Sequence, residues 1–145
     1  MLSAVTEFLA SCHCGALEAR YRTAVPVDAW SVRACQCAFC RAHGALTTSD
    51  PAGTLAFAAR DIGRVHRYRF SSGTTDFLIC RECGVYVGAR LEASRGHFGV
   101  LNTRALRPIP AALPEPASMH YGDEPAELRQ ERRTARWTPL APASL

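Results

Sequence analysis

The chain has 145 residues, the size of one ordinary domain, and is long enough to bury a hydrophobic core without covalent cross-links. Hydrophobic residues make up 48% and charged residues 21%, which excludes a disordered chain, and the apolar runs are far too short to span a bilayer. All 17 basic residues are arginines, which excludes a lysine Schiff base and a P-loop lysine. We therefore expect a single domain over residues 1–145 and no membrane partner.

The first ten residues lack a basic segment and carry Glu7 inside their apolar stretch, so they do not resemble a secretory signal. This predicts a cytoplasmic protein. In that reducing compartment, clustered cysteines are more typical of metal ligands or catalytic thiols than of disulfides. The chain has seven cysteines, an odd number that cannot pair completely within one chain.

Short segments of alternating hydrophobicity, separated by breaks that contain glycine or proline, predict a mainly β fold. They are expected to form a β core over about residues 4–105. The expected strands cover residues 5–9, 16–21, 29–34, 45–48, 55–58, 65–70, 75–79, 85–91 and 97–101.

The composition changes after the expected core, where a Pro-rich and helical C-terminal extension covers about residues 106–145. Four prolines fall within residues 106–118. Proline fixes φ and supplies no hydrogen-bond donor to a sheet, so we expect an extended surface segment there. A short helix is expected over residues 124–136, with Asp123 as its cap.

This helix carries a run of basic residues, Arg129, Arg132, Arg133 and Arg136. Glu127 lies just before the run and Glu131 lies within it, so a solvated helix face is favoured over a phosphate site. The two tryptophans, Trp30 and Trp137, are expected to pack in the core rather than to bind a substrate.

The seven cysteines fall into three motifs, Cys12-His13-Cys14, Cys35-Gln36-Cys37-Ala38-Phe39-Cys40 and Cys80-Arg81-Glu82-Cys83. The first lies between two expected strands, where the following Gly15 permits a turn. The central motif is expected in a loop or short turn. A structural zinc site usually has four protein ligands, and the first and third motifs supply such a set. The ligands predicted for this structural zinc are Cys12, Cys14, Cys80 and Cys83.

Three thiols remain, those of Cys35, Cys37 and Cys40. Three protein ligands with an open fourth position are typical of a catalytic zinc, where an exogenous thiol or water can bind. Two alternatives stay open: either His43 or His13 fills the fourth position, or the seven thiolates are shared through a bridge between two closed sites. The sequence predicts two zinc ions per chain, in an enzyme or, as the alternative, in a non-catalytic zinc-stabilised binding module.

The charge of the chain argues against a nucleic-acid partner. The formal net charge is +4, but it falls to about +1 when seven thiolates and two Zn²⁺ ions are counted. The arginines are spread along the chain, without a basic stripe that aromatic residues interleave. We expect no nucleic acid among the partners.

At these motifs the chain resembles the glutathione-dependent formaldehyde-activating enzyme (GFA) family, which shares a fold with the Mss4-like zinc proteins. The resemblance runs through all three cysteine motifs and through Tyr68-Arg69-Phe70-Ser71-Ser72-Gly73, and it covers roughly residues 8–105. It implies Mss4-like folded sheets around zinc sites. It also implies a structural zinc at Cys12, Cys14, Cys80 and Cys83, and a catalytic zinc at Cys35, Cys37 and Cys40.

The activity implied by the resemblance is the addition of glutathione, or a similar thiol, to formaldehyde or a related aldehyde, and its reversal as a carbon–sulfur lyase. The glutathione sulfur would lie on or near the catalytic zinc. Two residues just after the central motif are expected to contact the substrate: Arg41 as a bidentate partner of a carboxylate, and His43 as a proton relay.

Overall fold

The structure is a computed structural model, and it describes residues 4–145. Residues 1–3 belong to the segment expected not to be a secretory signal and lie outside the described residues. The chain is mainly β, as the sequence predicts, and its two α-helices are α1 (Ala38–His43) and α2 (Ala126–Arg136). Its strands are β1 (Thr6–Ser11), β2 (Leu17–Thr23), β3 (Val32–Cys35), β4 (Thr47–Thr48), β5 (Thr54–Ala59), β6 (Val65–Tyr68), β7 (Thr75–Cys80), β8 (Tyr86–Ala93), β9 (Gly96–Asn102), β10 (Ala117–Met119) and β11 (Thr138–Pro139).

Strands β1 to β9 confirm the nine strands expected from the sequence, with shifted ends. The third begins at Val32 rather than at residue 29, because Val27–Ala29 form a 3-10 turn. The sixth ends at Tyr68 rather than at residue 70, because the chain turns there and Ser71 has a positive φ of 57°. Within residues 4–145 no helix is long and apolar enough to cross a membrane.

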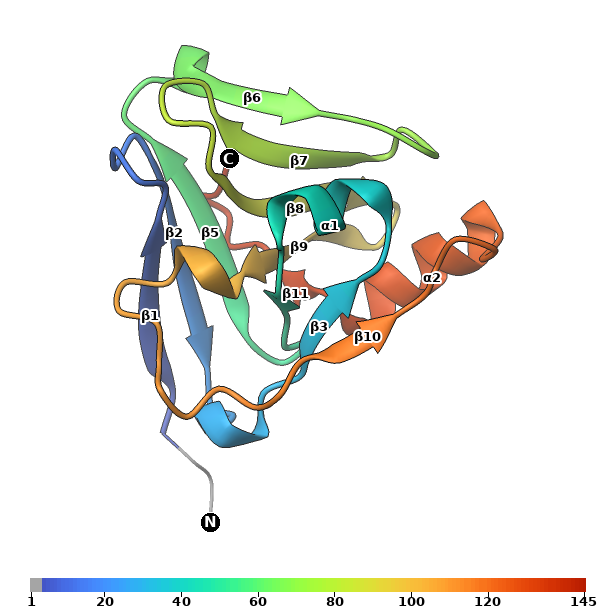
Figure 1. Cartoon of the computed structure of the whole chain (residues 1–145), viewed down its shortest axis with the longest axis horizontal. Coiled ribbons are helices and arrows are strands. Elements are labelled where there is room, and N and C mark those ends of the chain that lie inside the picture. Colours follow the sequence, from blue (N-terminus) through green and yellow to red (C-terminus); the bar gives the residue numbers. More distant parts are fainter. Residues whose placement is uncertain (1–3) are drawn as a thin grey trace.

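The strands form two sheets (Figure 1). The smaller is antiparallel, in the order β1-β2-β5, and the larger has the order β10-β3-β4-β9-β8-β7-β6, with β11 paired to β9. Strand β2 alternates strictly between buried and exposed residues, so its apolar side chains all reach one face. That face packs against the larger sheet and forms the main core.

A glycine lets the two sheets approach each other closely. A Cβ atom on Gly88 of β8 would lie 2.7 Å from the ring of Phe57 of β5, closer than any real contact. Trp30 packs in the same core, edge-on against Phe8 at 4.8 Å and Tyr21 at 5.3 Å between ring centroids. The expectation that Trp30 is a packing residue is therefore confirmed.

The opposite face of the larger sheet carries a second cluster, which includes residues of α1 and the tryptophan after α2. A β-bulge helps to build it. The pairing of β7 with β8 shifts between Leu78 and Ile79, so β8 has one residue more than β7 at this point. Because of this extra residue, Tyr86 and Ala89 both face the second cluster although they are three positions apart.

The C-terminal part of the chain departs from its expected form in two ways. Residues 117–118, expected in an unpaired surface segment, belong to β10, which pairs in parallel with β3 and places Met119 beside Cys35. The prolines precede this strand, so its ladder keeps its donors. The predicted cap of the following helix is also wrong, because Pro125 occupies the N-cap position and no side chain bonds there.

Candidate metal centres

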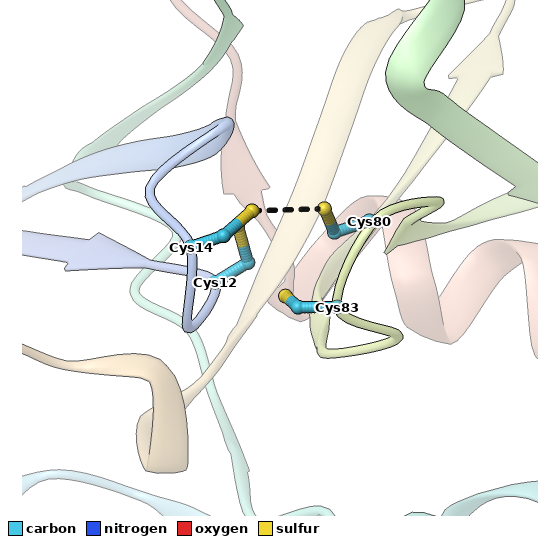
Figure 2. A group of neighbouring side chains, drawn as sticks. All are labelled: Cys12, Cys14, Cys80 and Cys83. Atoms are coloured by element: carbon cyan, nitrogen blue, oxygen red, sulfur yellow. Dashed lines mark hydrogen bonds between the residues drawn. The ribbon is translucent and has the colours of Figure 1, made fainter.

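Two turns bring the cysteines of the first and third motifs together (Figure 2). One turn joins β1 to β2 and the other joins β7 to β8. In the first, Gly15 has a φ of 82° and donates its N–H to the carbonyl of Cys12 at 3.2 Å; in the second, Gly84 has a φ of 78° and donates to Cys80 at 2.9 Å. Side chains disfavour such φ values, so glycine permits both turns. The turns present Cys12, Cys14, Cys80 and Cys83 to one another.

The four sulfur atoms have the spacing of a tetrahedral zinc site. The Sγ atom of Cys14 lies 3.7 Å from that of Cys12 and 3.6 Å from that of Cys80, and all four atoms lie within 4.8 Å of one another. Zn–S bonds of about 2.3 Å place the sulfurs of a tetrahedron about 3.8 Å apart. The donor set therefore fits a closed zinc site that ties two distant turns together.

Two of the four thiols differ in how readily they ionise without a cation. Burial raises the pKa of Cys12 to about 11. Burial also opposes ionisation of Cys83, but backbone hydrogen bonds with Cys14 and Val85 outweigh it and lower the pKa of Cys83 to about 6. A bound Zn²⁺ deprotonates its thiol ligands outright, so it would remove this difference and stabilise all four thiolates.

The remaining thiols, of Cys35, Cys37 and Cys40, form a second group within 4.8 Å of one another. The first lies at the end of β3, the second is the N-cap of α1 and the third lies inside α1. The Sγ atom of Cys37 accepts a hydrogen bond from the backbone N–H of Cys40 at 3.4 Å. Helix geometry therefore fixes the second and third sulfurs relative to each other.

The loop or short turn expected for the central motif is wrong, because residues 38–43 form helix α1. The sulfur of Cys37 takes the capping role that an oxygen usually has at an N-cap. Gly44, in the left-handed conformation with a φ of 59°, ends the helix and donates to the carbonyls of Arg41 and Cys40. Local signals for a helix were thus present, but cysteine is not a customary capping residue.

Two of these thiols have strongly divergent pKa values. A hydrogen bond from the Cys40 thiol lowers the pKa of Cys35 to about 5, and Arg132 adds a favourable positive charge. The same hydrogen bond, with burial, raises the pKa of Cys40. These surroundings favour negative charge on Cys35, as a cation site requires.

No fourth protein ligand from the described part of the chain completes this group. Among residues 4–145, no histidine, aspartate or glutamate has a ligand atom within 4.8 Å of all three sulfurs. His43 is exposed, and its ring lies tilted against that of Phe39, with 4.5 Å between the ring centroids. The two cysteine groups also share no member, so the arrangement of the described residues gives no support to a bridge between two closed sites. The donor set fits a zinc ion with an open fourth position.

The three thiols open into a cavity of about 610 Å³. This volume falls within the range of roughly 300–1,000 Å³ that is usual for small-molecule sites. One wall is a cluster of aromatic rings centred on Phe39, whose ring lies 4.8 Å from Phe77, 5.1 Å from Phe70 and 5.2 Å from Tyr86. Burial raises the pKa of Tyr86 well above its ordinary value, so its phenol stays neutral beside the thiolates.

The other wall comes from the C-terminal segment, where Trp137 and the arginines at 129, 132 and 133 line the cavity. The expected solvated helix face is therefore wrong for these three arginines, whose guanidinium groups turn inward. Trp137 is buried in the second cluster, as expected, but it also contacts the cavity. Arg41 and His43, expected to touch the substrate, are exposed and are not among the residues that line the cavity.

The spacing of the arginines in the sequence already indicated that they share one face of the helix. Arg129, Arg132, Arg133 and Arg136 are spaced as i, i+3, i+4 and i+7, the positions that form one face of a helix. Apolar residues at this spacing would have predicted a buried face. A face of arginines instead predicts contact with solvent, unless negatively charged groups lie next to it. The sequence does not show that this helix lies beside three thiols.

Comparisons with known proteins agree with this arrangement. The family model described as glutathione-dependent formaldehyde-activating enzyme matches residues 7–119. A crystal structure of a Rhodobacter sphaeroides protein is similar, with a TM-score of 0.55 and 25% sequence identity over 73% of this chain and 97% of that chain. The comparison with curated proteins gives no match. Because the family model spans well over half of the chain and includes every cysteine of both groups, the chain belongs to the glutathione-dependent formaldehyde-activating enzyme family.

Proposed function

We propose that the protein is a zinc-dependent carbon–sulfur lyase, which joins the thiol of glutathione to formaldehyde as S-hydroxymethylglutathione and splits the adduct again. One observation carries this proposal: three thiols, without a fourth ligand from residues 4–145, open into a cavity large enough for a small molecule. Family membership supports glutathione and formaldehyde as the substrates. A related thiol or aldehyde would use the same chemistry.

The residues that would hold the zinc of the reaction are Cys35, Cys37 and Cys40. Bound there, Zn²⁺ would supply a Lewis acid at neutral pH and favour the thiolate form of a thiol near it. The other zinc would be structural and held by Cys12, Cys14, Cys80 and Cys83. All seven cysteines are free thiols, which supports a reducing compartment such as the cytoplasm.

The reaction needs few groups from the protein. In the forward direction a carbon–sulfur bond forms between the thiol and the aldehyde carbon, and the thiol proton ends on the former carbonyl oxygen. The rings of Phe39, Phe70 and Phe77 keep bulk water from one side of the cavity. Arg132 places positive charge near Cys35, where it favours negative charge on a reacting sulfur.

Exchange NMR on glutathione and formaldehyde tests the proposal. With catalytic amounts of zinc-loaded protein, we expect the adduct and free glutathione to interconvert faster than in buffer alone. Cys37→Ala is the matched control, because it removes one of the three thiols and leaves the four-sulfur group intact. Interconversion at the uncatalysed rate would overturn the lyase and favour a non-catalytic zinc-stabilised binding module.

A further inference from the structure

Arg133 is a partly buried cation in the cavity wall, and no carboxylate of residues 4–145 pairs with it. Its Nη1 atom donates to the hydroxyl of Thr75 at 2.7 Å, and its guanidinium lies 5.0 Å from the ring centre of Trp137. Its Nε atom is buried and has no hydrogen-bond partner among residues 4–145. Burial lowers the pKa of Arg133 to about 10, which shows that its surroundings disfavour the charge.

The two neighbouring arginines are in a different position. Arg132 donates to both carboxylate oxygens of Glu124, with Nε–Oε2 and Nη2–Oε1 distances of 3.0 Å, and its guanidinium stacks at 3.6 Å on Tyr121. Arg129 lies 3.7 Å from the same carboxylate and donates to Ser71 at 2.9 Å. The carboxylate of Glu124 therefore pairs with Arg129 and Arg132, and it does not pair with Arg133.

A partly buried arginine in this position lacks an anionic partner within the described chain. A buried charge is costly unless it is paired and its donors are satisfied, and guanidinium matches a carboxylate through two parallel hydrogen bonds. The described residues that line the cavity include three arginines and no aspartate or glutamate. The phenylalanine rings of the aromatic wall, meanwhile, offer apolar surface. A ligand that satisfies both walls combines an anionic end with an apolar body.

We propose that Arg133 is the centre of an anion subsite, which binds the carboxylate of an organic ligand whose apolar part lies against the ring of Phe39. The subsite is made by α2, which lies beyond the residues that the family model matches. For the thiol substrate the inference rests on the proposed function: Arg133 would hold one of its carboxylates. Arg133 is then a specificity-determining residue, and it takes no part in forming the carbon–sulfur bond.

Calorimetric titration with two matched probes tests the subsite without any turnover. The probes are 3-phenylpropanoate, which has a carboxylate and a ring, and 3-phenylpropanamide, which is its neutral counterpart. On the zinc-loaded full chain we expect the carboxylate to bind at least about tenfold more tightly than the amide. In Arg133→Gln this preference is expected to vanish, because only the carboxylate probe loses its partner.

Two further variants separate recognition from folding. Arg136→Gln makes the same change on the same helix at an exposed position outside the cavity, and should leave the preference at its wild-type value. Arg133→Lys keeps the charge but not the two-pronged donor, and should restore part of the preference. If Arg133→Gln does not fold, Arg133→Lys decides the question. A carboxylate preference equal to that of the wild type, in Arg133→Lys or in a folded Arg133→Gln, overturns the proposal. Arg133 would then be only a structural contact of Thr75 and Trp137.

The glutathione arm distinguishes failure of this inference from failure of the proposed function. In Arg133→Gln we expect the KM for glutathione to rise at least about tenfold with little change in kcat, while glutathione ethyl ester, esterified at its glycyl carboxylate, is affected less. Equal effects on glutathione and its ester would show that Arg133 does not bind that carboxylate. A probe preference that depends on Arg133, in a protein without lyase activity, would retain the subsite and reject the reaction.

Discussion

The two cysteine groups use the same ligand chemistry in different surroundings. The group of four sits between two glycine turns and closes a tetrahedron with its own sulfurs. The group of three lies between β3 and α1, and its vacant side faces a cavity lined by rings and arginines. The number of protein ligands and the access of small molecules to the metal, rather than the kind of ligand, therefore separate a structural zinc site from one that can bind a substrate.

The largest expected effect comes from opening the closed group. Cys83→Ala removes one of four sulfurs and weakens the tie between the turn that joins β7 to β8 and the turn that joins β1 to β2, so we expect a loss of about 4 kcal/mol or more in the free energy of unfolding. Chemical denaturation of the zinc-loaded protein measures this loss. A loss no larger than that of Cys37→Ala would show that the two groups are equivalent.

The second prediction concerns the open group. Cys37→Ala is expected to lower kcat/KM for adduct formation at least about 100-fold, because the two sulfurs that remain bind zinc poorly. Its denaturation should stay cooperative, since the four-sulfur group is unchanged. Activity is measured by the exchange experiment and folding by circular dichroism. Collapse of the fold in this variant would instead make the open group structural.

When a chelator removes the metal, the two cysteine groups should lose their zinc ions one after the other. Three thiolates facing a cavity hold an ion less firmly than four in a closed site, so one zinc per chain is expected to leave at a chelator concentration at least about tenfold lower than the other. Elemental analysis during a chelator titration, with the thermal transition followed in parallel, provides the measurement. Simultaneous loss of both ions, together with unfolding, would remove the distinction.

The smallest expected effect is on the arginine wall. A hydrogen bond from Arg132 lowers the pKa of Glu124 below its ordinary value of 4.5, so its ionised form stabilises the folded protein at neutral pH. Glu124→Gln should therefore cost about 1 kcal/mol at pH 7, because both side chains keep part of their surface in solvent, with 19% exposed for Arg132 and 20% for Glu124. Since a depressed pKa contributes stability that is lost as pH falls, the difference between wild type and variant should shrink below pH 4.5. A difference that does not depend on pH would mean that the ion pair is not its source.

Much of the fold followed from short-range patterns. Nine strands were found because alternation and glycine breaks are local features, and β2 keeps its alternation over its whole length. Helix α1 was missed because its N-cap is the sulfur of Cys37 rather than an oxygen. Strand β10 was missed because three residues after a Pro-rich segment become a strand only through their pairing with β3.

The sequence by itself determined the partition of the seven cysteines, since counting ligands needs only residue types and spacing, and the same two groups assemble in space. Tertiary structure alone decided what lies across the cavity from the open group. Helix α2 folds back so that Arg129, Arg132 and Arg133 line that cavity, while Arg41 and His43, close to the thiols in sequence, are exposed and do not line it. The reason is physical: a ligand count is local, but the direction in which a charged helix face points depends on packing and charge pairing between distant parts of the chain.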